Sequence, residues 1–133
     1  MIVTNILVIL IAICLAYYDS TILNVGKYIY DHTSRAIVRG ITLAGVSFVP
    51  IQEGIIEYFL IFTINCTIFW IVFDILINIM TDKSPYYIGG QAKTDKMARN
   101  LFGNDGFLYL KYKFAFLMIM YFIYLFYIGA IQF

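Results

Sequence analysis

Long apolar runs dominate the pattern of hydrophobic and polar positions along this chain. Three of them, residues 2–18, 58–80 and 109–131, are close to the roughly 20 residues that a membrane-spanning helix needs. A fourth, shorter stretch covers residues 35–51, with two arginines at its front and Pro50 near its end. The pattern therefore predicts three spanning helices, and the fourth stretch is either another span or a re-entrant or interfacial helix.

The composition also predicts a membrane location. Of the 133 residues, 62% are hydrophobic and 19% are aromatic, whereas soluble domains have roughly 45 to 50% apolar residues. A soluble domain of this size could not bury so much apolar surface, so part of this surface must face lipid. The net charge of +1 argues against a nucleic-acid partner, because neutralising phosphates takes a concentrated basic face.

The positions of lysine and arginine favour four spans over three. If residues 35–51 span, all nine basic residues fall on one side, as the positive-inside rule requires. Three spans would divide them between the two sides. The predicted fold is therefore an all-α integral membrane bundle, with three spans plus a re-entrant helix as the alternative. The basic loops lie on the cytoplasmic side and both termini on the opposite side. The four helices of this single domain, residues 1–133, are expected at about 2–18, 31–51, 58–80 and 107–131.

The predicted inside loop, residues 81–106, contains a short amphipathic segment. Its apolar face is formed by Met97, Ala98, Leu101 and Phe102. This pattern predicts a short helix in the headgroup region, with Lys93, Lys96 and Arg99 as interfacial, lipid-facing side chains. Residues 103–106 (GNDG) then predict a turn directly before the last span, because glycine, asparagine and aspartate tolerate positive φ.

A carboxylate inside the third predicted span is the strongest candidate for a site. Asp74 lies about 9 Å from the expected helix end at residue 80, at about 1.5 Å per residue. Aspartate is too short to reach water from this depth, so it needs a partner or a proton. One face of the second span carries His32, Arg35 and Arg39. This span begins on the inside, the side of the membrane to which Asp74 lies nearer. We expect an ion pair between Arg39 and Asp74. Asn78 and either Arg35 or His32 are expected to support it.

This polar cluster has two interpretations. It either locks the second span against the third, or it lines a site for a proton, an ion or a lipid headgroup. Basic residues at an inside interface attract anionic headgroups, so a lipid-phosphate role for His32, Arg35 and Arg39 stays open. Asn65 and Trp70 on the third span are expected to make helix contacts, and the asparagine would contribute about 1 kcal/mol by hydrogen bonding.

The sequence carries no pattern that predicts catalysis. It has one histidine and two cysteines, so the usual zinc-binding spacings are absent. Neither a phosphate-binding glycine loop nor a nucleophile elbow occurs. We therefore expect no enzyme, no catalytic residues, no metal site and no cofactor.

One set of residues resembles a family pattern. The run Phe73-Asp74, Asn78, Tyr87-Ile88-Gly89 and Asp95, preceded by the basic residues of the second span, resembles small uncharacterised multi-pass membrane proteins of bacteria and their phages. The resemblance covers about residues 30–100. It implies a bacterial or phage membrane and a paired polar cluster. It does not point to any particular activity.

Three functions fit these observations. The leading hypothesis is a non-catalytic structural or interaction subunit of a membrane assembly. Under any of the three, the expected partners are the lipid bilayer and other membrane proteins or further copies of the chain. The first alternative is a holin-like, pore-forming phage protein. The second is a small ion or proton carrier that uses Asp74.

Overall fold

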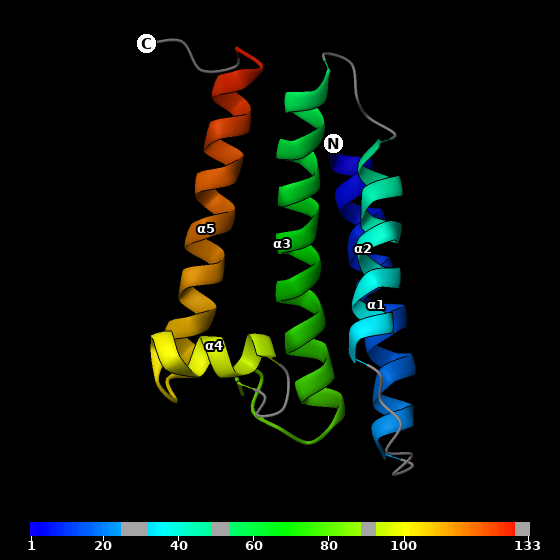
Figure 1. Ribbon diagram of the computed structural model, residues 1–133, viewed down its shortest axis with the longest axis vertical. Coiled ribbons are helices and arrows are strands. Elements are labelled where there is room, and N and C mark those ends of the chain that lie inside the picture. Colours follow the sequence, from blue (N-terminus) through cyan, green and yellow to red (C-terminus); the bar gives the residue numbers. More distant parts are fainter. Residues whose placement is uncertain (25–31, 49–53, 89–92, 130–133) are drawn as a thin grey trace.

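The computed structural model describes residues 1–24, 32–48, 54–88 and 93–129. The described residues form five helices: α1 (Ile2–Asn24), α2 (His32–Phe48), α3 (Ile55–Met80), α4 (Lys93–Phe102) and α5 (Gly106–Tyr127). The predicted all-α bundle is confirmed. Four long helices run alternately down and up, and α4 lies across one end, which we call the α4 end (Figure 1). The start of α1 and the end of α5 both lie toward the opposite end.

Three of these helices, α1, α3 and α5, are long and apolar enough to cross a membrane. Their mean hydropathy is 2.2, 2.2 and 1.4, which indicates a membrane protein. The 17 residues of α2 cover about 25 Å, somewhat less than the roughly 30 Å of a hydrocarbon core. This helix runs antiparallel to α1 along the bundle (Figure 1). A fourth span stays a prediction, and its expected end at residues 49–51 lies outside the described residues.

The first helix continues six residues beyond its predicted end at residue 18, to Asn24. Polar side chains in this extra part satisfy their hydrogen bonds within the helix. Ser20 Oγ donates to the carbonyl of Tyr17 at 2.8 Å, and Thr21 Oγ1 donates to that of Tyr18 at 2.7 Å. Both hydroxyls thus find acceptors within α1 itself.

The core lies where α1 and α2 pack against α3. The face of α1 that is turned inward carries mostly small side chains at four-residue intervals: Thr4, Val8, Ala12, Ala16 and Ser20, all buried. Such side chains let two helix backbones approach closely, which favours association in lipid. Ile61, Ile64 and Ile68 of α3 complete this cluster.

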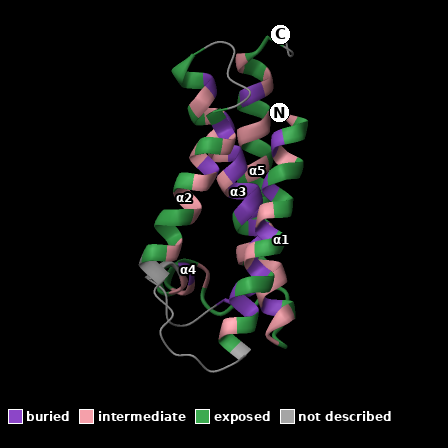
Figure 2. Cartoon of the chain, turned by 90° about the vertical axis from the view of Figure 1, so that its right-hand side faces the viewer, coloured by how far each residue is buried: buried purple, intermediate pink, exposed green. Residues whose placement is uncertain are grey.

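Two parts of the bundle are loosely packed. The first buried residue of α2 among its described side chains is Leu43, so its earlier half diverges from α1 (Figure 2). α5 packs against α3 and, at its start, against α4. In the most apolar stretch of α5 only 11% of residues are buried, compared with 44% in α3. Much of α5 therefore faces outward.

Candidate functional site

Asp19 on α1 is the centre of the first charged cluster. Its side chain is only 2% exposed, and it pairs with Arg35 and Arg39 of α2. Each guanidinium donates to a different carboxylate oxygen. Both arginines reach Asp19 because residues four apart lie on the same face of a helix. The Arg39 guanidinium also lies 4.2 Å from the centre of the Phe73 ring, a cation–π distance. We call Asp19, Arg35 and Arg39 the Asp19 cluster.

A cleft opens beside this cluster where α2 diverges from α1. Its volume is about 270 Å³, and it is lined by Leu15, Tyr18, Asp19, Ser34, Arg35, Val38 and Arg39. The two arginine side chains are 24% and 19% exposed, whereas the aspartate is enclosed. The cleft is therefore positively charged on one wall and apolar on another.

The second charged cluster joins α3 to α5. Lys113 Nζ donates to Asp74 Oδ2 at 2.5 Å. The lysine side chain is 4% exposed and the aspartate side chain 35%. The ammonium also lies 4.3 Å from the ring centre of Trp70 and 4.1 Å from that of Tyr109. We call these four residues the Lys113 cluster.

The expected pair between Arg39 and Asp74 is wrong, because each residue has a different partner. Arg39 binds Asp19, which the predicted first span left out. Asp74 binds Lys113. Lys113 lies seven residues from the start of α5 and Asp74 six from the end of α3, so both are about 10 Å from the α4 end of their helices. Comparing depths along the predicted spans would have found this lysine.

Other residues of the expected cluster lie elsewhere. The amide of Asn78 donates to the carbonyls of Tyr87 at 2.9 Å and Pro85 at 3.3 Å, so it holds the loop after α3 and does not support the Asp74 pair. Arg35 supports Asp19. The side chain of His32 lies outside the described residues.

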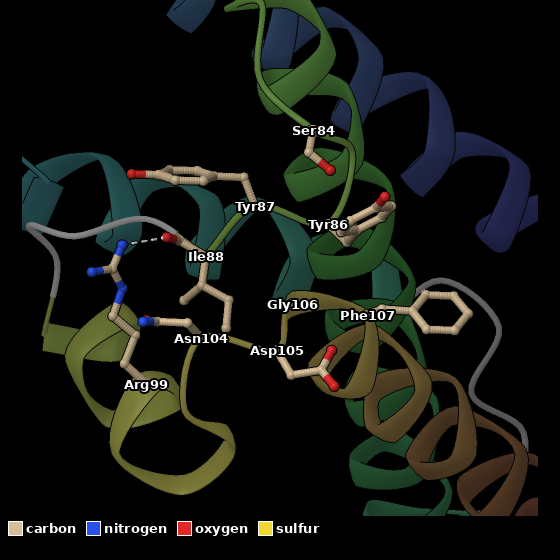
Figure 3. Close-up of a pocket in the computed structure, with 9 residues that line it drawn as sticks. All are labelled: Ser84, Tyr86, Tyr87, Ile88, Arg99, Asn104, Asp105, Gly106 and Phe107. Atoms are coloured by element: carbon tan, nitrogen blue, oxygen red, sulfur yellow. Dashed lines mark hydrogen bonds between the residues drawn. The ribbon is translucent and has the colours of Figure 1, made fainter.

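The loop after α3 and the start of α5 enclose a pocket of about 440 Å³ (Figure 3). The pocket is lined by Ser84, Tyr86, Tyr87, Ile88, Arg99, Asn104, Asp105, Gly106 and Phe107. Its two charged side chains bind backbone at its edges. Arg99 donates to the Ile88 carbonyl at 2.8 Å, and Asp105 accepts from the Leu108 N–H at 2.9 Å, which caps α5. The Arg99 contact therefore fixes the loop after α3 against α4.

Of the three basic residues of α4 that were expected to face lipid, Arg99 does not. Arg99 is half-buried and turned toward the loop, because it donates to the carbonyl of Ile88. Lys96 is exposed, and the side chain of Lys93 lies outside the described residues. The expected apolar face is also divided: Met97 is 65% exposed, whereas Ala98 is 4% exposed.

Asn65 and Trp70 both lie at contacts between helices. The amide of Asn65 is fully buried and donates to Ser47 Oγ of α2 at 2.8 Å. Trp70 packs its ring edge-on against Tyr109 of α5, with 5.8 Å between the ring centres.

Two further polar contacts, absent from the sequence-based expectations, hold α5. Tyr124 Oη donates to Glu57 Oε1 of α3 at 3.3 Å, and the amide of Asn5 on α1 donates to Tyr121 Oη at 2.5 Å. No pattern in the sequence pairs these residues.

The fold and the two clusters define a helical-bundle membrane protein with ion pairs inside the bundle. In the described part of the chain, no three histidine, cysteine, aspartate or glutamate side chains are placed to hold a metal ion. Comparison with protein-family models, curated proteins and solved structures finds no match. The resemblance to small bacterial and phage membrane proteins stays a prediction.

Proposed function

We propose that this chain is a non-catalytic multi-pass membrane protein that acts as a structural or interaction subunit of a membrane assembly. The observation that carries the proposal is the open face of α5. Large side chains between 47% and 69% exposed cover this face: Phe107, Phe114, Phe116, Met118, Ile119, Phe122 and Phe126. Helices associate in lipid through van der Waals packing, and large rigid aromatic side chains offer much surface for it.

The charged side chains support the same proposal. Asp19 and Lys113 are turned into the bundle, where their partners come from neighbouring helices of the same chain. A charged side chain that pairs with a neighbouring helix inside the bundle does not contact a substrate. The outer surface of α5 is broad and apolar, which suits packing against another transmembrane helix.

The test is the native mass of the protein extracted from its source in mild detergent, with every co-purifying chain identified. Met118→Trp places a bulky ring on the open face of α5, where the side chain is 69% exposed. Ile41→Trp makes a similar change on the outer face of α2, at 68% exposure, and is the matched control. We expect a stoichiometric partner that Met118→Trp releases and Ile41→Trp retains.

Two outcomes would contradict the subunit proposal. A partner released equally by both tryptophan variants would show that the face of α5 is not the contact. A homo-oligomer without other chains would favour the carrier or a holin-like pore, and the pore rests on architecture alone.

A second candidate function is an ion or proton carrier built on Asp74. It is favoured by one observation: the side chain of Asp74 is 35% exposed although it pairs with a nearly buried lysine about 9 Å from the helix end. Carboxylates at such depth mark proton and ion pathways in many membrane proteins. In liposomes, Asp74→Asn should abolish proton or cation flux, whereas Asp82→Asn, a change to an exposed aspartate beyond α3, should not. Equal flux in all three proteins would exclude this candidate.

A further inference from the structure

The pocket beside the start of α5 carries two opposite charges that do not pair with each other (Figure 3). Arg99 of α4 and Asp105 at the start of α5 both line it, and in the described part of the chain no ion pair joins them. Each side chain is instead held by one backbone group, at Ile88 and at Leu108. A pocket with one charge of each sign suits a ligand that also carries both.

The positive side of the pocket has donors to spare. A guanidinium carries five N–H groups, and Arg99 gives one hydrogen bond to a described residue, the carbonyl of Ile88 at 2.8 Å. Its Nε is enclosed, and no acceptor among the described residues meets it. A charged donor without an acceptor is unfavourable. Planar guanidinium groups match phosphate oxygens well, so this side suits a phosphate.

The negative side of the pocket has acceptors to spare. The carboxylate of Asp105 accepts one N–H among the described residues, that of Leu108, and it is exposed. Its full charge exceeds the partial positive charge, about half a unit, at the start of a helix. The rings of Tyr86 and Phe107 line the same pocket and are 50% and 53% exposed. Carboxylates and aromatic ring faces both attract an ammonium group.

The position of the pocket indicates what kind of molecule would reach it. It lies at the α4 end, beyond the last residue of α3 and beside the first residue of α5. Both helices are apolar enough to cross a membrane, so this end falls in the headgroup layer. The volume of about 440 Å³ lies within the roughly 300–1,000 Å³ of small-molecule pockets.

We propose that this pocket binds the headgroup of a zwitterionic phospholipid that carries a primary ammonium group. Arg99 binds the phosphate, and Asp105 binds the ammonium beside the rings of Tyr86 and Phe107. The acyl chains then lie in the hydrocarbon layer along the outer side of α5. A headgroup that has the phosphate but no ammonium would meet the Asp105 carboxylate without a counter-charge and should bind less tightly.

The experiment is native mass spectrometry of the full chain in mild detergent, titrated with phosphatidylethanolamine and with phosphatidylglycerol of the same acyl chains. We expect the wild-type protein to prefer phosphatidylethanolamine. Asp105→Asn removes the charge but keeps a good helix cap, since asparagine caps about as well as aspartate. It should reduce the preference about fivefold, the upper end for an exposed ion pair.

Arg99→Gln should act differently, because both lipids carry a phosphate. It should weaken the binding of both lipids by a similar factor, about fivefold, and leave the preference unchanged. If this variant does not fold, Arg99→Lys keeps a donor for the Ile88 carbonyl but cannot bind a phosphate with two parallel hydrogen bonds. It should weaken the binding of both lipids in the same way.

Each variant has a matched control at the same end of the bundle. Asp82→Asn removes a negative charge from an exposed position beyond α3, and it should keep the wild-type preference. Lys96→Gln removes a positive charge from an exposed position on α4, three residues before Arg99. It should bind phosphatidylethanolamine as the wild-type protein does.

Three results would overturn the proposal. The first is wild-type binding of phosphatidylglycerol that equals or exceeds that of phosphatidylethanolamine. The second is an equal loss of preference in Asp105→Asn and Asp82→Asn, which would indicate general electrostatics at this end. The third is saturable binding of free phosphoethanolamine without lipid that Arg99→Gln abolishes, which would make a soluble molecule the ligand.

Discussion

The Lys113 cluster gives the sharpest prediction, because its two charged residues differ in exposure. Lys113 is 4% exposed, so Asp74→Asn leaves an ammonium group enclosed without its counter-charge. Breaking a buried pair in this way costs about 3–5 kcal/mol. The ring centres of Trp70 and Tyr109, at 4.3 and 4.1 Å, offset about 1–2 kcal/mol through cation–π attraction. We expect a net loss of about 1–4 kcal/mol in the free energy of unfolding, with a central value of about 2–3 kcal/mol.

The opposite change should cost less. Lys113→Met leaves Asp74, whose side chain is 35% exposed, so the carboxylate has room to take up a proton. The loss should be about 1–2 kcal/mol, at the lower end for a charge-assisted hydrogen bond. The double variant should cost less than the sum of the two single variants, with a coupling energy of at least about 1 kcal/mol.

The assay is reversible unfolding in mixed micelles of mild detergent and dodecyl sulfate, followed by far-ultraviolet circular dichroism. All four members of the double-mutant cycle are measured at one pH. Additive losses, or a larger loss for Lys113→Met than for Asp74→Asn, would refute the argument from exposure. Additive losses would also mean that the contact between Lys113 and Asp74 does not stabilise the packing of α5 on α3.

Two further predictions concern packing. Ala16 is fully buried against α3, so Ala16→Leu should destabilise the protein by about 1–3 kcal/mol, whereas Cys14→Leu on the exposed side of α1 should be nearly neutral in the same unfolding assay. Similar losses in both variants would argue against the packing of α1. Gly106→Ala should also destabilise, although alanine favours helices, because its methyl group would collide with the carbonyl of Tyr86. Gly45→Ala meets no neighbouring atom and should stabilise α2 by about 0.5–1 kcal/mol, and a gain at both glycines would contradict this contact.

The sequence predicted the long helices well, since apolar runs of that length have few other uses. The errors lie where polar residues continue a helix. α1 extends past residue 18, where Ser20 and Thr21 bond back to the preceding turn and Asp19 pairs with arginines. A hydropathy profile shows neither feature. It scores each residue by its type, whereas the arginines that pair with Asp19 come from another helix.

The candidate site was predicted in its residue types and its location, but not in its pairing. Asp74, Arg35 and Arg39 do lie in ion pairs at the α4 end, but their partners are Lys113 and Asp19. Which charges meet depends on which helices are neighbours. α3 lies between α1 and α5, so its sides face different helices, and this order is a property of the tertiary fold.

The polar contacts of α5 have a consequence for how the bundle assembles. Lys113 meets Asp74 near one end of α5, while Tyr124 meets Glu57 and Tyr121 meets Asn5 farther along the helix. An apolar helix surface alone would allow α5 to rotate about its axis or slide along α3 with little change in energy. Each of these three contacts is lost by a shift of one residue, since that turns the side chains by about 100°. The insertion register of the last helix is therefore encoded in a few hydrogen-bonding side chains, and the outward aromatic surface contributes little to it.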